Sequence, residues 1–216
     1  LRTAAATAVA TRALARHDAT TLALLGCGEQ AACHARALPL VRDIREVRVW
    51  GRDTARAEAF AAKWLTGIER VRVSASPREA IKGADIICTL THSDTPILQG
   101  AWLEAGQHLN LVGASTVHAR EVDDVTVARG KFVVDLREHA LSEAGELLQA
   151  IALGLVDESH IHAEIGEVLS GVKSGRESDK EITIYKSLGH IAQDIAVADA
   201  IERRLSTDES AHRIAW

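Results

Sequence analysis

The sequence predicts an α/β fold, a doubly wound parallel sheet followed by C-terminal helices. Short β-branched apolar runs alternate with amphipathic stretches from residue 21 to residue 135, an order typical of βαβ units. These runs are apolar on both faces, which indicates a sheet covered by helices on both sides. A turn with two glycines, Gly26 and Gly28, follows the first of these runs.

Six strands and the helices between them follow from these patterns. The expected strands are residues 21–25, 46–50, 71–74, 85–90, 108–113 and 131–135. Helical periodicity predicts the intervening helices at residues 29–41, 54–65, 76–83 and 120–130. A further helix is expected before the first strand, beginning at Leu1 and Arg2 without a capping residue.

The glycine turn has the strand, turn and helix context of a Rossmann NAD(P)-binding fold. Gly26 would make the tight turn, and Gly28 would let a pyrophosphate approach the backbone. Ala31 stands where the third glycine of the motif is usual, and its methyl group still permits close helix packing. The helix that starts at Glu29 and Gln30 would offer unpaired N–H groups to the anion. The alternative is an ordinary βα turn without a ligand.

The end of the second strand bears on which dinucleotide binds. The chain has Gly51, Arg52 and Asp53 there. A carboxylate would hold a ribose 2′-hydroxyl and repel a 2′-phosphate, whereas an arginine pairs with the phosphate through two hydrogen bonds. Arg52 therefore favours NADP(H), with Arg56 one helical turn further on as a second contact. Asp53 keeps NAD(H) open, and Arg52 on a solvated loop is the alternative without function.

Beyond Asp135 we expect only helices. A polar segment lies at residues 170–181, and a final helix with a wide apolar stripe is expected from Ile182 to Leu205. We therefore divide the chain into an NAD(P)-binding domain with its leading helix, residues 1–181, and a C-terminal helix, residues 182–216, which needs a surface to pack against.

Composition excludes several classes of protein. The 216 residues carry a net charge of −5, which does not indicate nucleic-acid binding. No apolar run approaches the roughly 20 residues of a membrane span, so we expect a cytoplasmic protein without membrane partners. Cys27, Cys33 and Cys88 lie in apolar segments and are expected to be reduced, buried thiols. His160 and His162 lack a third ligand at suitable spacing, so no metal site is expected.

Several motifs together resemble the ornithine cyclodeaminase and mu-crystallin family. They match it in order and spacing across nearly the whole chain: LRTAAATAVA, GCGEQA, VRVWGRD, GADIICTLTHSDTPIL, HLNLVGAS, AREVDD, AEIGEVLSG and EITIYKSLG. The family is typically a homodimer with an N-terminal substrate and dimerisation domain that is absent here. Because the sequence contains no methionine, we expect it to be a piece of a longer chain.

The resemblance implies roles for individual residues. Arg2 is similar to the arginine that lies between the cofactor and the substrate carboxylate, which makes it a candidate catalytic residue. Thr91 matches a residue near the cofactor, and Val112 matches one beside the nicotinamide. Ser187 matches a serine that reaches the active site from the final helix. The other residues that bind the substrate carboxylate would lie in the missing domain.

One position departs from the family members that cyclise ornithine. These carry an aspartate where this chain has Ser115, and the GAS sequence at residues 113–115 instead resembles the mu-crystallin branch, which acts as a ketimine reductase. Deamination of ornithine needs a positioned base, and a serine is not one. Reduction of a C=N bond needs an aligned hydride donor and a carboxylate clamp. We therefore expect NADP(H)-dependent reduction of cyclic imine carboxylates, with Arg2 as clamp and Ser115 at most a hydrogen-bonding group.

Three other activities stay open. The chain could belong to a redox-neutral, NAD-dependent ornithine cyclodeaminase, with His118 or a residue of the missing domain in place of the acid. It could belong to an amino acid dehydrogenase, such as one acting on alanine. A protein that binds NADP(H) or another ligand without turnover is the third.

Overall fold

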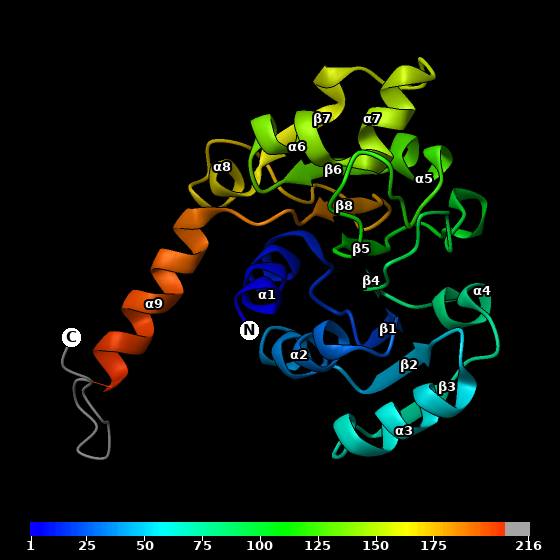
Figure 1. The fold of residues 1–216 in the computed structure, drawn as a ribbon. Coiled ribbons are helices and arrows are strands. Elements are labelled where there is room, and N and C mark those ends of the chain that lie inside the picture. The colour runs from blue at the N-terminus through cyan, green and yellow to red at the C-terminus, as the bar shows by residue number, and fades with distance from the viewer. Residues whose placement is uncertain (206–216) are drawn as a thin grey trace.

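One parallel sheet organises the computed structural model, which describes residues 1–205 (Figure 1). All neighbouring strands run parallel, in the order β3-β2-β1-β4-β5-β8-β6-β7. Its strands are β1 (Thr21–Leu25), β2 (Glu46–Trp50), β3 (Arg70–Val73), β4 (Ile86–Thr89), β5 (His108–Leu111), β6 (Lys131–Val134), β7 (Ile161–Glu164) and β8 (Thr183–Lys186). The chain order reverses direction at β1, so β1 and β4 flank a topological switch point where α/β folds bind ligands.

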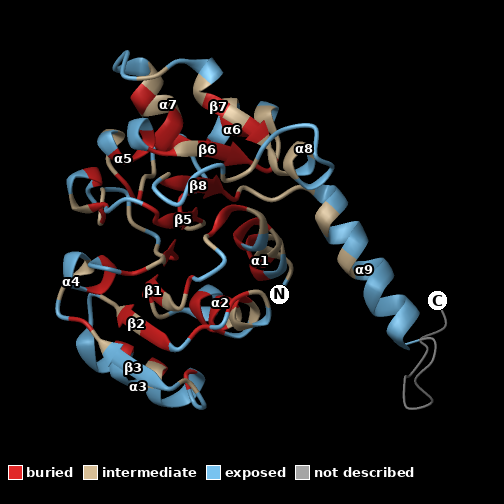
Figure 2. Ribbon diagram, turned by 180° about the vertical axis from the view of Figure 1, so that it is seen from behind, coloured by how far each residue is buried: buried red, intermediate tan, exposed pale blue. Residues whose placement is uncertain are grey.

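Helices cover both faces of the sheet, as expected. They are α1 (Arg2–Leu14), α2 (Glu29–Ala37), α3 (Thr54–Trp64), α4 (Pro77–Ile81), α5 (Asp124–Arg129), α6 (Arg137–Glu143), α7 (Gly145–Ala152), α8 (Ile165–Leu169) and α9 (Ile191–Leu205). One apolar core lies under α1, α2 and α3, and another lies under α4 to α7. The central strands between them are buried along most of their length, whereas β3 at the edge of the sheet is largely exposed (Figure 2).

The six expected strands are all present, with boundaries that agree within two residues. The expectation of helices alone after Asp135 is wrong, because β7 and β8 belong to the sheet. The helix expected from Ile182 begins only at Ile191. Ile184 fits an apolar helical stripe, but in the folded chain it belongs to strand β8, which is buried between β5 and β6. The sheet therefore extends past residue 181, where the expected domain ended.

Two arginines hold the carboxyl end of α1. Arg42 Nη2 donates to the carbonyl of Ala15 at 2.9 Å, and Arg176 Nε donates to that of Leu14 at 2.7 Å. Cations at this end satisfy carbonyls that lack partners within the helix and complement its dipole. With that end fixed, the opposite end of α1 brings Arg2 to the pocket described below.

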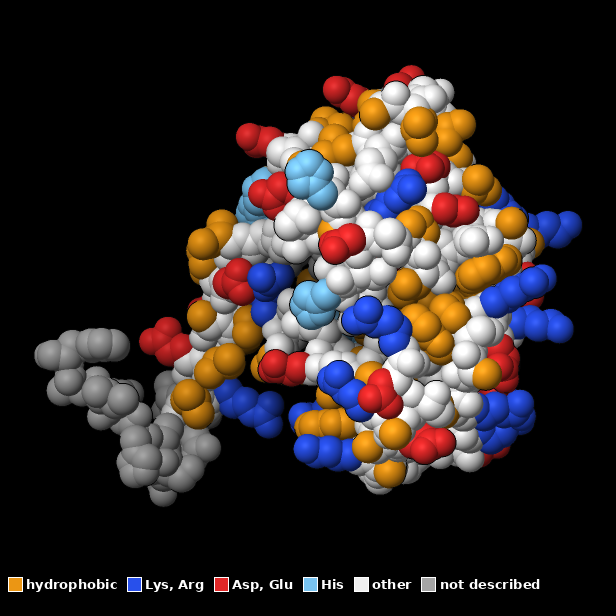
Figure 3. Space-filling view, turned by 45° about the vertical axis from the view of Figure 1, so that its right-hand side comes forward, with side chains coloured by type: hydrophobic (Ala, Val, Ile, Leu, Met, Phe, Trp, Pro, Cys, Tyr) orange, Lys and Arg blue, Asp and Glu red, His pale blue; other side chains and the backbone are white. Residues whose placement is uncertain are grey.

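α9 projects away from the sheet (Figure 1), and none of its described residues is buried. Apolar side chains lie exposed along it (Figure 3), among them Ile191, Ile195 and Ile201. That this helix packs on a further domain stays a prediction. Within residues 1–205, no helix is both long and apolar enough to cross a membrane.

Candidate functional site

The turn after β1 has a conformation that glycine adopts readily and other residues do not. Gly26 has a φ of +126°, and a Cβ added to it would lie 2.6 Å from the Leu90 carbonyl oxygen. Gly28 is the N-cap of α2, and a Cβ there would meet no atom within 4 Å. Since Gly28 faces open space, the unpaired N–H groups of the first turn of α2 are accessible to an anion. Ala31 is fully buried, consistent with close packing of this helix.

A cleft of about 730 Å³ opens at the carboxyl ends of β1, β2 and β4. It brings together nine of the residues that the sequence assigned to cofactor binding, which are Gly26, Gly28, Glu29, Gln30, Gly51, Arg52, Asp53, Arg56 and Thr91. Arg52 and Arg56 are both exposed at its outer end. The outer end of the cleft therefore combines the glycine turn with two cations.

Asp53 has a structural task that the sequence analysis did not assign. Its Oδ1 accepts a hydrogen bond of 3.1 Å from the Arg56 backbone N–H, so Asp53 is the N-cap of α3. Asp53 is also among the residues that line the cleft. Gly51 is confined as well, because a Cβ there would lie 2.9 Å from Cys27 Sγ.

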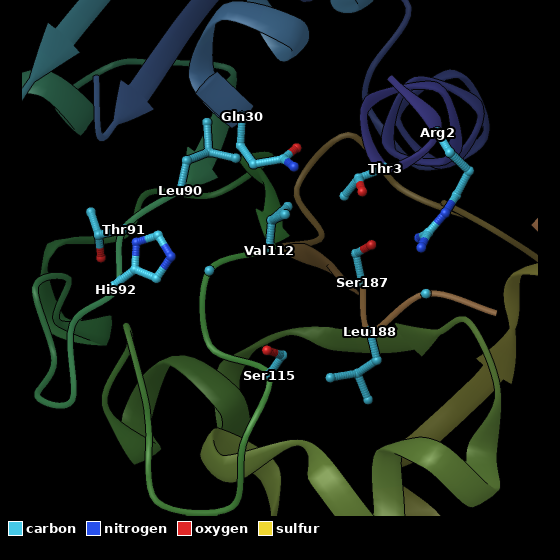
Figure 4. A pocket seen from close by; sticks show the side chains of 12 residues that line it. Arg2, Thr3, Gln30, Leu90, Thr91, His92, Val112, Ser115, Ser187 and Leu188 are labelled. Atoms are coloured by element: carbon cyan, nitrogen blue, oxygen red, sulfur yellow. The ribbon is translucent and has the colours of Figure 1, made fainter. Parts of the chain in front are cut away.

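A second pocket of about 200 Å³ adjoins the cleft, and the two share Gln30, Leu90, Thr91 and His92. Figure 4 shows the side chains that line it. It holds both residues expected to be catalytic, Arg2 and Ser115, and two further residues expected to bind the cofactor, Val112 and Ser187. The structure thus brings every sequence-assigned site residue to one continuous depression.

Arg2 reaches this pocket from the first turn of α1. Its Nε donates to Asp194 Oδ1 at 2.8 Å, and its side chain is 27% exposed. The guanidinium lies over Gly189, where a Cβ would be 2.6 Å from Nη1. Gly189 has a φ of +88°, so both its conformation and its lack of a side chain give Arg2 this place.

Ser187 does not lie on the final helix, as the resemblance implied, but directly after β8. Its hydroxyl is buried and makes no hydrogen bond of regular geometry within the described residues. The turn that follows is held by Asp135, whose Oδ2 accepts hydrogen bonds from Leu188 N at 2.8 Å and Gly189 N at 2.7 Å. Asp135 Oδ1 accepts another from the Tyr185 hydroxyl, and burial, together with this carboxylate, raises the pKa of Tyr185 well above its usual value.

Sequence reasoning missed Glu121, a buried carboxylate behind the pocket. Glu121 Oε1 accepts from Thr91 N at 2.6 Å and from Thr91 Oγ1 at 2.7 Å, and Oε2 accepts from Gly113 N at 2.8 Å. Burial raises the pKa of Glu121. Because the Thr91 hydroxyl gives its proton to Glu121 and accepts from Ser93 N at 3.3 Å, a further partner could only donate to its remaining lone pair.

Lys186 and Glu146 were missed as well. Both side chains are fully buried, and their nearest charged atoms lie 3.2 Å apart. Lys186 also donates to the carbonyl of Ala114. Glu121 and Lys186 stand inside motifs that carried the family resemblance, AREVDD and KSLG. Their burial depends on strands far apart in the sequence, so no local pattern indicated it.

The cysteines and histidines outside the pocket are only partly as expected. Cys88 is buried, which raises its pKa to about 12, whereas Cys27 and Cys33 are only half-buried. The Nε2 atoms of His160 and His162 lie 2.8 and 2.9 Å from backbone carbonyl oxygens. Across residues 1–205, no group of three or more His, Cys, Asp or Glu side chains is placed to hold a metal ion.

Comparison with known proteins identifies the family. The model of the ornithine cyclodeaminase/mu-crystallin family matches residues 1–209. A Delta(1)-pyrroline-2-carboxylate reductase of Bacillus cereus is 43% identical over 200 residues, which are 92% of this chain and 61% of the relative. The mouse ketimine reductase mu-crystallin is 40% identical over 200 residues, covering 93% of this chain and 60% of the relative.

A solved structure agrees with these relatives. The Delta(1)-pyrroline-2-carboxylate reductase of Thermococcus litoralis, in complex with NADH and L-proline, superposes with a TM-score of 0.94 and 35% identity, covering 99% of this chain and 66% of that one. The present chain spans about 60% of the length of the curated relatives it matches. It belongs to the ornithine cyclodeaminase/mu-crystallin family.

Proposed function

We propose that this chain is the cofactor-binding part of an NADP(H)-dependent reductase of cyclic imine carboxylates. The observation that carries the proposal is the pair formed by the glycine-turn cleft and the adjoining pocket, with Arg2 on one side of that pocket and Ser115 on the other. The pocket offers a cation that can pair with a carboxylate, and it also offers hydroxyl groups. The position that would supply an acid in ornithine cyclisation is a serine.

The described residues fit a nicotinamide dinucleotide. Gly28 leaves open space at the amino end of α2, the requirement for a pyrophosphate against the backbone. The buried Ser187 hydroxyl and the remaining lone pair of Thr91 Oγ1 supply polar partners at the other end. Two structurally similar proteins, the Thermococcus litoralis reductase and an archaeal alanine dehydrogenase, bind NADH and NAD respectively, which supports the same class of cofactor here.

Hydride transfer to the imine carbon is the chemistry that the cofactor supplies when bound. The chain itself would orient the substrate, because the Arg2 guanidinium can pair with a carboxylate next to the C=N bond. Asp194 and Gly189 hold Arg2 at the pocket. Ser115 would donate or accept a hydrogen bond and need not remove a proton, since the iminium carries its proton on arrival.

Arg52 supports the preference for the phosphorylated cofactor. It stands exposed at the outer end of the cleft beside Arg56, where a guanidinium can take a 2′-phosphate. We also propose a homodimer, supported by a similar archaeal alanine dehydrogenase that is a dimer with bound NAD.

The test uses the protein expressed from its complete reading frame, supplied with NADPH and Δ1-piperideine-2-carboxylate or Δ1-pyrroline-2-carboxylate. Loss of NADPH absorbance that depends on the imine is the expected result. Ammonia released from ornithine without net use of cofactor would identify a cyclodeaminase, and binding of cofactor without either reaction would identify a binding protein.

The variant Arg2→Ala tests the clamp. We expect the KM for the imine to rise at least tenfold, because one charge-assisted contact to a carboxylate contributes about 1.5 to 3 kcal/mol. The Kd for NADPH should change little. Arg12→Ala, an exposed arginine on the same helix, is the matched control, and an equal effect of both substitutions would reject the assigned role.

A further inference from the structure

The loop after β5 is held at two consecutive residues by buried charges of opposite sign. The Gly113 N–H donates to Glu121 Oε2 at 2.8 Å, and the Ala114 carbonyl accepts from Lys186 Nζ. The next residue is Ser115, which lines the pocket. Glu121 and Lys186 come from different segments, so the loop is tied to both the chain before α5 and the end of β8.

The same contacts tie this loop to the one after β4. Glu121 also accepts both hydrogen bonds from Thr91. The approach is close, since a Cβ on Gly113 would lie 2.1 Å from the Thr91 carbonyl oxygen. Thr91 and Ser115, which line the same pocket, therefore have a fixed relative position.

Stability alone does not account for Lys186. Lys186 and Glu146 are both fully buried, and two buried charges lose hydration that their attraction repays only in part. Replacing such a pair with apolar side chains of similar volume is often neutral or stabilising. What Lys186 contributes specifically is the hydrogen bond to the Ala114 carbonyl, which fixes the direction of the loop.

We propose that Lys186, supported by Glu146, and Glu121 are positioning residues that hold the loop at residues 113–115 against the nicotinamide end of the cleft. They act through the loop and touch neither substrate nor cofactor. The kinetic part of this inference rests on the proposed reductase function, whereas its structural part does not.

The decisive variant is Lys186→Met combined with Glu146→Leu, made in the protein from the complete reading frame. Lys131→Met is the matched control, because Lys131 is also a largely buried lysine paired with two carboxylates, Glu177 and Glu181, but at the amino end of β6. Amide hydrogen exchange over residues 112–116 is measured together with kcat, KM and the melting temperature.

We expect exchange over residues 112–116 to accelerate at least tenfold in the double variant, while β5 and β8 keep their protection. The kcat should fall at least tenfold with a change in the KM for NADPH of less than about threefold, since the loop orients the reacting end of the cofactor. The melting temperature should stay at or above that of Lys131→Met, which should show normal loop exchange and normal kcat.

Glu121→Gln is the second variant, and it tests whether buried groups hold the loop at residues 113–115 even if the double variant does not fold. The Gln carbonyl can still accept from Thr91, but its NH₂ group faces the Gly113 N–H, so loop exchange should again accelerate. Unchanged loop exchange in the folded variants would overturn the inference. If the wild-type protein turns over no imine, the proposed function fails, and the exchange measurement alone still tests the positioning roles.

Discussion

The two ends of the cleft are built in opposite ways. The outer end comes from one continuous stretch, residues 26–56, and its contacts are offered by backbone at the glycine turn and by exposed side chains such as Arg52. The inner end is assembled from segments far apart in the chain, around Arg2, Thr91, Ser115 and Ser187. Buried polar groups hold these segments together.

This difference explains how each end should respond to change. The outer end depends on local backbone conformation and on single surface charges, so its substitutions should alter cofactor affinity and choice. The inner end depends on a network of buried groups, so its substitutions should alter orientation, turnover and pH dependence.

The largest effect is expected at the outer end, for Gly26→Ala. The alanine would need a φ of +126° and would place its Cβ 2.6 Å from a carbonyl oxygen. We expect a loss of about 3 kcal/mol of stability or more, and at least a hundredfold weaker cofactor binding. Gly67→Ala is the control, because Gly67 has a φ of +88° with no atom near its Cβ; denaturant unfolding should show a loss of only about 1 kcal/mol there. Equal losses would contradict the close approach at Gly26.

The next effect is the pH dependence of stability, and it arises from buried histidines that contact the helix carrying Arg2. Burial lowers the pKa of His34 to about 4 and that of His108 to about 3. Both contact α1, the helix that carries Arg2, through Thr7 and Thr11. In the unfolded chain these histidines take up protons near pH 6.5, whereas in the folded chain they stay neutral until the pH is much lower. Stability should therefore fall as the pH is lowered below 6.5.

Each of these histidines should lower the free energy of unfolding by about 1.6 kcal/mol as the pH falls from 6.5 to 5. Unfolding free energies measured across this range check the expectation. His34→Gln should make the profile shallower, and His17→Gln, at an exposed position, should leave it as it is. A pH profile that His34→Gln does not alter would show that this histidine is not the cause.

The third effect is the choice of cofactor at the outer end. Arg52→Ala should weaken NADPH binding about tenfold, as expected for one exposed contact to a phosphate, and leave NADH binding nearly unchanged. Titration of both cofactors measures the ratio. Arg45→Ala, at an exposed arginine paired with Asp43, is the control. An unchanged ratio in Arg52→Ala would reject the role of Arg52.

The smallest effect separates the two tasks of Asp53. Asp53→Asn keeps an acceptor for the Arg56 N–H and should leave stability unchanged, whereas Asp53→Ala should cost about 1 kcal/mol. If the Asp53 carboxylate repels the 2′-phosphate of NADPH, both variants should bind NADPH more tightly than the wild type does. A tighter affinity in Asp53→Ala alone would mean that the charge has no such effect.

The same contrast separates what the sequence revealed from what it did not. Strands β1 to β6 and the turn at Gly26 could be predicted, since their signals are local runs and glycine spacing. β8 could not, because its residues also fit a helical stripe and only their place between β5 and β6 decides the conformation. Glu121 and Lys186 have charged side chains, which are usually found at the surface. Their burial depends on partners from distant segments.

That the glycine-turn cleft binds a nicotinamide dinucleotide is the expectation on which the others at this site depend. Calorimetric titration of the protein from its complete reading frame with NADPH and with NADH tests it most directly. We expect saturable binding of both, tighter for NADPH, with the binding lost in Gly26→Ala and kept in Gly67→Ala. Absence of binding by either dinucleotide to the folded wild-type protein would contradict the account.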